Sequence, residues 1–354
     1  YEYSYNYQNW YPSAEYETTN TRKNIGLFDL TPFAKFELIG KNVHSELQHM
    51  CTANIKNEIG RTTYTQMVNT DGGIEADLTT VCLNKNHFRI ISSAAVRERD
   101  KHHILKNLDP KIEFKDVTED YACLGLFGPK SRSLISEMSG DYFKNEDFPF
   151  ATAKNINIKN TKVWAQRLSY VGELGWELYI PINEAKKIYN LIIEIGKKYN
   201  LCNAGVHAMD ILRMEKGYLH WGHDISPEEN QYEAGLSFAI SFKKNVDFIG
   251  KNSLFKKTGE KIKKKLIILS LKKSKPGFPL LLHDEPIYSD GKIIGRTTSG
   301  NYSFNYKKNI AFGYVDPEVD LKKSKIEIEV EKNKYEAIVE DKPIHDPENK
   351  ILNS

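Results

Sequence analysis

The sequence predicts an α+β fold that ends in a small β-barrel. Strands with alternating apolar side chains and helices with an apolar face follow one another through the first 250 residues. The composition changes at about residue 251, where a lysine-dense stretch begins. Beyond it, short strands separated by Gly/Pro turns are typical of an all-β unit. The two parts together indicate an α+β chain with a C-terminal barrel.

The size and charge of the chain exclude several classes of protein. A chain of 354 residues is too long for one small core, so we expect two or three domains. Fifty Lys and Arg residues nearly balance 47 Asp and Glu residues, which favours neither nucleic acid nor a membrane surface as a partner. No apolar run is long enough to cross a bilayer, and no signal-peptide pattern begins the chain. Four isolated cysteines suit a reducing compartment and argue against a structural zinc site.

The individual elements follow from local patterns. Residues 1–20 are aromatic and polar without helical periodicity, so we expect an irregular lead-in. Alternation predicts strands at 33–40, 63–69, 74–83, 87–93, 122–128, 162–170 and 176–181. Helical spacing predicts helices at 41–55, 94–108, 131–138 and 182–200. The strands of the barrel are predicted at 265–271, 285–300, 310–315, 325–330 and 334–340.

The stretch NTDGGIEADL (69–78) places two acids after a glycine turn. The turn at 71–73 should reverse the chain, because glycine reaches positive φ without a steric penalty. In the strand that follows, Glu75 and Asp77 share the face opposite to the apolar side chains. The pattern alone allows these acids to face either solvent or a cavity.

Two further stretches carry polar groups of interest. In RLSYVGELGWELYIP (167–181), Glu177 is again an acid on the second face of a strand, just after glycines. In residues 204–225, Asp210 and Arg213 form either a helix-surface ion pair or part of a site. His220 and His223 lack a third ligand and are weak candidates for a metal site. The lysine run 256–265 is either a solvated linker or a contact for an anionic ligand.

Common catalytic motifs are absent from the sequence. No GxGxxG follows a strand, no P-loop is present, and no G-x-S-x-G marks a nucleophile. Spacing alone therefore indicates an α+β protein with acids that line a possible cleft.

Several motifs in one order resemble a known family. They are NIGLFDLTPFAKFELIGKNV, NTDGGIEADLTT, LGLFGPKSRSLI, YVGELGWELYIP, AGVHAMDILRMEKGYLHWGHDI, GLSFAI and GRTTSGNYSFNYKKNIAFGYV. Over roughly residues 20–345 the chain resembles the folate-binding aminomethyltransferases, whose reference member is the T-protein of the glycine cleavage system. YEYSYNYQNWYPSAEYE, FDLTPFAKF and EKGYLHWGHDI are similar to the C-terminal half of dimethylglycine and sarcosine dehydrogenases.

This resemblance implies a more detailed architecture. The family fold is a three-domain cloverleaf of antiparallel sheets with flanking helices, in part ferredoxin-like, with a C-terminal β-barrel and a central folate channel. Mapped onto this chain, it implies a folate-binding domain at 1–50 and 121–250, a second α+β domain at 51–120 and a barrel domain at 255–354.

The resemblance also implies site residues. Asp77 matches the acid that lies at the reactive nitrogens of the folate, so it is the expected catalytic residue. The expected folate-binding residues are Tyr170, Glu177, Ile91, Ser93 and Trp221. No metal is expected. Glu75 stands where T-proteins commonly have an apolar residue, so it is given no role. Met209 replaces an arginine that assists folate binding in T-proteins, which leaves the contact to the folate tail open.

The function implied is tetrahydrofolate-dependent transfer of a one-carbon unit derived from an N-methyl amine. In the dehydrogenase subgroup an N-terminal FAD domain oxidises the amine, so we expect a covalent or associated FAD oxidoreductase domain as the partner, and FAD only there. The alternatives are a free-standing T-protein-like aminomethyltransferase or demethylase, and a non-catalytic folate-binding module as in iron–sulfur assembly proteins. The expected location is the cytoplasm, or the mitochondrial matrix in a eukaryote.

Overall fold

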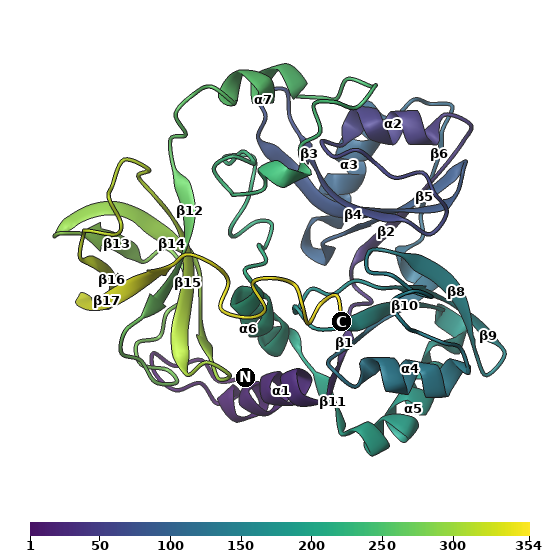
Figure 1. Ribbon diagram of the computed structural model, residues 1–354, viewed down its shortest axis with the longest axis horizontal. Helices are drawn as coiled ribbons and strands as arrows, with labels where there is room; N and C mark the ends of the chain where they lie inside the picture. The colour runs from purple at the N-terminus through teal and green to yellow at the C-terminus, as the bar shows by residue number, and fades with distance from the viewer.

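A computed structural model describes residues 1–354 as three sheets with flanking helices, set around a common centre (Figure 1). Two sheets are open, with six and five strands, and the third is a closed six-stranded barrel at the C-terminal end. The predicted α+β fold with a C-terminal barrel is therefore confirmed. No helix combines the length and the apolar character that crossing a membrane requires.

The first sheet has the strand order β11-β1-β7-β10-β9-β8. Its strands are β1 (Ile25–Asp29), β7 (Tyr121–Phe127), β8 (Ala153–Ile158), β9 (Thr161–Gln166), β10 (Gly175–Pro181) and β11 (Leu201–Ala204). All pairs are antiparallel except β11 with β1. Helices α4 (Ser131–Ser139) and α5 (Ala185–Gly196) cover one face.

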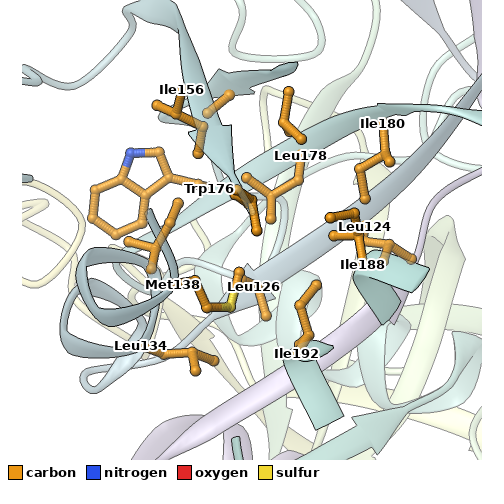
Figure 2. Close-up of a cluster of buried hydrophobic side chains, with 14 of the residues drawn as sticks. Leu124, Leu126, Leu134, Met138, Ile156, Trp176, Leu178, Ile180, Ile188 and Ile192 are labelled. Atoms are coloured by element: carbon orange, nitrogen blue, oxygen red, sulfur yellow. The ribbon is translucent and has the colours of Figure 1, made fainter. Parts of the chain in front are cut away.

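The largest core lies between this sheet and its two helices (Figure 2). Trp176, Leu178 and Ile180 alternate along β10 and are all buried in it. Figure 2 shows the Trp176 indole among aliphatic side chains from the sheet and the helices. Because side chains alternate along a strand, Glu177 and Tyr179 point to the opposite face, toward the centre of the molecule.

The second sheet has the order β3-β4-β5-β2-β6. Its strands are β2 (Ala34–Ile39), β3 (Thr62–Val68), β4 (Ile74–Asn84), β5 (His87–Ser92) and β6 (Glu113–Asp116). Helices α2 (Val43–Met50) and α3 (Arg97–Asn107) pack on it. Strand β2 pairs with β5 and β6, so the second sheet includes residues before 51. The domain boundary expected between residues 50 and 51 therefore does not coincide with a boundary between the sheets. Alternation predicts a strand at this position but does not reveal its partner.

The two open sheets are joined where their edge strands meet. The Ala153 amide at the start of β8 donates to the Gly60 carbonyl over 2.6 Å, just before β3 begins. Arg61 and Thr152 form an isolated antiparallel bridge beside this bond. This junction fixes the orientation of the second sheet relative to the first.

The barrel closes in the order β12-β15-β14-β13-β16-β17. Its strands are β12 (Lys265–Leu271), β13 (Pro286–Ser289), β14 (Lys292–Ser303), β15 (Lys308–Val315), β16 (Ile326–Val330) and β17 (Asn333–Glu340). The preceding lysine-dense stretch begins with a short helix, α7 (Lys251–Lys257). Helix α6 (Val206–Lys216) lies between the barrel and the first sheet (Figure 1).

The expectation of an irregular segment at residues 1–20 is wrong for its second half. Helix α1 spans Tyr11–Lys23, starts with a proline in its first turn and packs on β11 and α6. Its five buried residues are Tyr11, Ala14, Thr18, Asn20 and Thr21. Three of the five are polar, so a search for apolar periodicity does not detect this face.

Candidate functional site

Asp77 lies on the inner face of β4, opposite to Ala76 and Leu78, which are buried against the helices. The predicted strand parity is thus confirmed. Gln66, its cross-strand partner on β3, donates from Nε2 to Asp77 Oδ1 over 2.8 Å. Burial raises the pKa of Asp77 to about 6, while the contacts with Gln66 and Tyr64 act in the opposite direction. The carboxylate is held in a fixed position and ionises in mildly acidic solution.

The surroundings of Asp77 are partly desolvated. Its side chain is only half-buried, yet the loss of surrounding water is the main cause of its raised pKa. Tyr64 shows the same combination, because 39% of it is exposed and burial nevertheless raises its pKa well above the usual value. The charges of Asp77 and Tyr170 both act on Tyr64, so these three side chains share one region.

Glu75, two residues before Asp77, is already paired. Arg99 of α3 forms an ion pair with its carboxylate and also donates to its backbone carbonyl. The same guanidinium lies 4.4 Å from the centroid of the Trp221 ring. Trp221 is fixed in turn by its Nε1, which donates to the Ile74 carbonyl over 3.1 Å. Of the two acids on this strand face, only Asp77 has no basic partner.

The remaining predicted residues come from three segments. The Tyr170 hydroxyl donates to the Leu219 carbonyl over 2.8 Å, and its ring stacks on Tyr218 with centroids 6.1 Å apart. Glu177 is half-buried on the inner face of β10. Ser93 is half-buried, directly after β5.

Ile91 lies between the part of the candidate site on β4, which carries Asp77, and the part on β10, which carries Glu177. Ile91 is on β5 and lies opposite Thr79 of β4, which is two residues after Asp77. It belongs to the apolar cluster that contains Tyr179 and Val171. Asp77, Ile91 and Glu177 therefore lie on the inner faces of β4, β5 and β10, whereas Tyr170 and Trp221 lie in loops.

Several neighbours escaped sequence reasoning. Tyr64 and Gln66 contact Asp77, and Tyr179 contacts Glu177. Gln66 lies opposite Asp77 because a β-bulge between Met67 and Val68 shifts the hairpin register by one residue, and the turn at 71–73 does not reveal this shift. The Gly72 φ of +86° confirms that turn. Nothing local marked Arg99, which reaches Glu75 from another element.

Asp210 and Arg213 do form an ion pair, but it is not a surface pair, because Arg213 is buried. The guanidinium donates to Asp210 Oδ1 over 2.8 Å, to Asp224 Oδ2 over 2.6 Å and to Ser299 Oγ of the barrel over 2.8 Å. Asp224 also accepts from the His220 amide over 3.0 Å. This buried network ties α6 and the barrel to the loop 219–225, which carries Trp221 and the Leu219 carbonyl that binds Tyr170.

The histidines of this loop lie close together without forming a metal site. The ring centroids of His220 and His223 are 4.7 Å apart, and His283 of the barrel lies 6.0 Å from His223. No three His, Cys, Asp or Glu side chains are arranged to hold a metal ion. All four cysteines are buried and free.

Two family models match successive parts of the chain. Residues 1–244 match the GCVT N-terminal domain, and residues 264–346 match the glycine cleavage T-protein C-terminal barrel domain. The chain therefore belongs to the glycine cleavage T-protein family. In fold it is similar to the glycine cleavage system aminomethyltransferase T from Bartonella henselae, with a TM-score of 0.84 at 21% identity over 94% of this chain and 90% of that one.

Its relatives fall into two sizes. An aminomethyltransferase from Halothermothrix orenii is 33% identical over 86% of this chain and 84% of its own length. The 4-methylaminobutanoate oxidase (formaldehyde-forming) from Paenarthrobacter nicotinovorans is 33% identical over 99% of this chain but 42% of its own length. Human mitochondrial dimethylglycine dehydrogenase is 29% identical over 97% of this chain and 40% of its own length. The chain thus spans about two fifths of the oxidase and dehydrogenase relatives.

Proposed function

We propose that the chain transfers a one-carbon unit to tetrahydrofolate, forming methylene-tetrahydrofolate from an iminium or formaldehyde-level carbon. The observation that carries this proposal is the position of Asp77. It is an acid without a basic partner, held by Gln66 in partly desolvated surroundings beside Tyr64 and Tyr170. A fixed carboxylate in such surroundings stabilises a developing cation strongly, since little reorganisation is needed when the charge appears.

The other predicted residues suit recognition of a reduced pterin. Glu177 offers carboxylate oxygens that accept N–H groups from an aminopyrimidine edge. The Tyr170 hydroxyl is occupied by the Leu219 carbonyl, so this residue contributes its aromatic ring. Tetrahydrofolate supplies the amine nitrogens that take up the carbon. Asp77 stabilises the cationic carbon donor and accepts the proton that the attacking amine loses.

The lengths of the relatives support the proposal that this chain works with an oxidoreductase domain or subunit. The aminomethyltransferase relative has nearly the length of this chain, whereas the relatives named as oxidase or dehydrogenase are more than twice as long. We infer that oxidation belongs to the part of those relatives that this chain does not match. The proposed partner is therefore an FAD-dependent oxidoreductase domain or subunit that oxidises an N-methyl amine such as dimethylglycine or sarcosine. The length match with aminomethyltransferase favours a free-standing transferase as the second candidate.

The experiment is a parallel measurement of binding and turnover with the purified chain. Calorimetry should show tetrahydrofolate binding, and methylene-tetrahydrofolate should form faster than in the uncatalysed condensation at low formaldehyde. No binding would refute the proposal. Binding without any acceleration would instead identify a non-catalytic folate-binding module. The chain should also purify colourless and leave dimethylglycine unoxidised. A bound flavin would contradict the assignment of amine oxidation to a separate domain or subunit.

A further inference from the structure

Glu177 has a buried neighbour that no step of the proposed reaction uses. Tyr179 lies two residues further along β10 on the same face and is only 1% exposed. Its hydroxyl donates to Glu177 Oε2 over 2.8 Å. On the neighbouring strand β9, Gln166 Nε2 lies 3.4 Å from the same Tyr179 oxygen. The phenol therefore links the half-exposed carboxylate to the interior of the molecule.

The Tyr179 ring is itself held in place by the other open sheet. The Arg89 guanidinium on β5 lies 5.7 Å from the centroid of the Tyr179 ring and 4.5 Å from that of Tyr121. Arg89 is anchored by Glu37 of β2, whose Oε1 accepts from Arg89 Nε over 3.0 Å. The ring is thus buried beside this guanidinium, with its hydroxyl directed at Glu177.

This contact also affects the ionisation of Glu177. Burial raises the pKa of Glu177, and hydrogen bonding from Tyr179 and Gln166 opposes that rise. Cys123 on β7 and Arg89 on β5 act on the Tyr179 hydroxyl, and Lys35 on β2 and Asp29 at the end of β1 act in turn on Cys123. The Tyr179 hydroxyl is the one donor from a titratable side chain bonded to the Glu177 carboxylate. Without this donor, the carboxyl group would keep its proton to a higher pH.

We propose that Tyr179 is a positioning residue, which orients Glu177 and keeps it ionised so that Glu177 accepts N–H groups from the pterin. The proposal rests on the proposed function, since it assigns a role toward the same ligand. Tyr179 itself contacts no ligand in this account, because it is enclosed behind the carboxylate. Its effect on binding should therefore depend on pH and on the presence of Glu177.

The test compares Tyr179→Phe with the unchanged chain. The affinity for 5-formyltetrahydrofolate, a stable reduced folate, is measured by calorimetry as the pH is lowered from mildly alkaline to acidic. Protonation of Glu177 removes an acceptor, so affinity should fall as the pH falls through the pKa of Glu177. Loss of a hydrogen bond to a charged group should move this fall to higher pH by about one unit or more. At alkaline pH the variant should regain most of the affinity.

Two controls separate positioning from general damage. Tyr121→Phe removes another hydroxyl beside the same arginine and should leave the pH profile unchanged. In a Glu177→Gln background, Tyr179→Phe should no longer shift the profile, because nothing at position 177 titrates. A uniform loss of affinity at every pH, or an equal shift in the Glu177→Gln background, would overturn the positioning role. If the unchanged chain bound no reduced folate at all, the proposed function would fail instead.

Discussion

Replacing Asp77 with Asn tests the proposed chemistry most directly. The substitution keeps the size of the side chain and an oxygen that accepts from Gln66, but it deletes the negative charge. Because β4 is a central strand with the apolar side chains Ala76 and Leu78 buried behind it, the backbone should not move. Any change in rate should therefore report the charge alone.

The size of the effect follows from the surroundings of the carboxylate. A unit charge about 4 Å from a developing cation interacts by ~4 kcal/mol at an effective dielectric constant near 20. Asp77 is half-buried and restrained by Gln66, so little of this interaction is lost to reorganisation. Losing such a preorganised group typically lowers kcat by roughly 100-fold or more. Folate affinity should change far less, because the full cation exists only near the transition state.

The assay is formation of methylene-tetrahydrofolate, with tetrahydrofolate binding measured in parallel on the same preparations. Glu75→Gln is the matched control, since it removes an equal charge two residues away on the same strand face. Glu75 is neutralised by Arg99, so this variant should retain nearly full turnover. Near-normal turnover in Asp77→Asn, or an equal loss in both variants, would refute a specific electrostatic role for Asp77.

Three further outcomes are expected. Turnover should rise with pH through about 6 and then level off, because Asp77 must lose its proton to act, and Asp77→Asn should abolish this limb of the pH–rate profile. Glu177→Ala should weaken tetrahydrofolate binding by more than ~1.5 kcal/mol in calorimetry through lost charge-assisted hydrogen bonds; unchanged affinity in a folded variant would remove Glu177 from the site. Arg213→Met should lower the free energy of unfolding in urea by about 3–5 kcal/mol, since it leaves the buried Asp224 carboxylate without its cation. Lys251→Met, which breaks an ion pair with an exposed aspartate, should change it by less than about 1 kcal/mol, and equal losses would contradict this account.

The fold could be predicted wherever a local period dominates. Alternation correctly separates the buried from the inward-facing side chains along β4 and β10, and the turn-rich C-terminal part does form a barrel. Helix α1 was missed because Thr18 and Thr21 contribute to its buried face, and its burial depends on β11 and α6. The partner of β2 was also hidden, because strand pairing is decided by contacts between distant segments.

The candidate site shows the same limit at the level of single residues. Glu75 and Asp77 are equivalent in the local pattern, and only Arg99 on a separate helix makes one of them an ion-paired residue. Family resemblance, not spacing, distinguished Asp77 from its neighbour. Arg213 pairs with Ser299 across 86 positions of sequence, so its burial could not be inferred from helical spacing with Asp210.

The strand order also determines whether another protein can bind this one by adding a strand to a sheet edge. A closed barrel has no free edge, and the two open sheets leave only β11, β8, β3 and β6 at their margins. Strand β11 has four residues and is covered by α1, while β3 and β8 meet at the Arg61–Thr152 bridge. Strand β6 is equally short and presents Glu113 and Lys115 to water. None offers a long apolar edge for strand addition, so recognition of the proposed oxidoreductase partner would rely on side-chain surfaces.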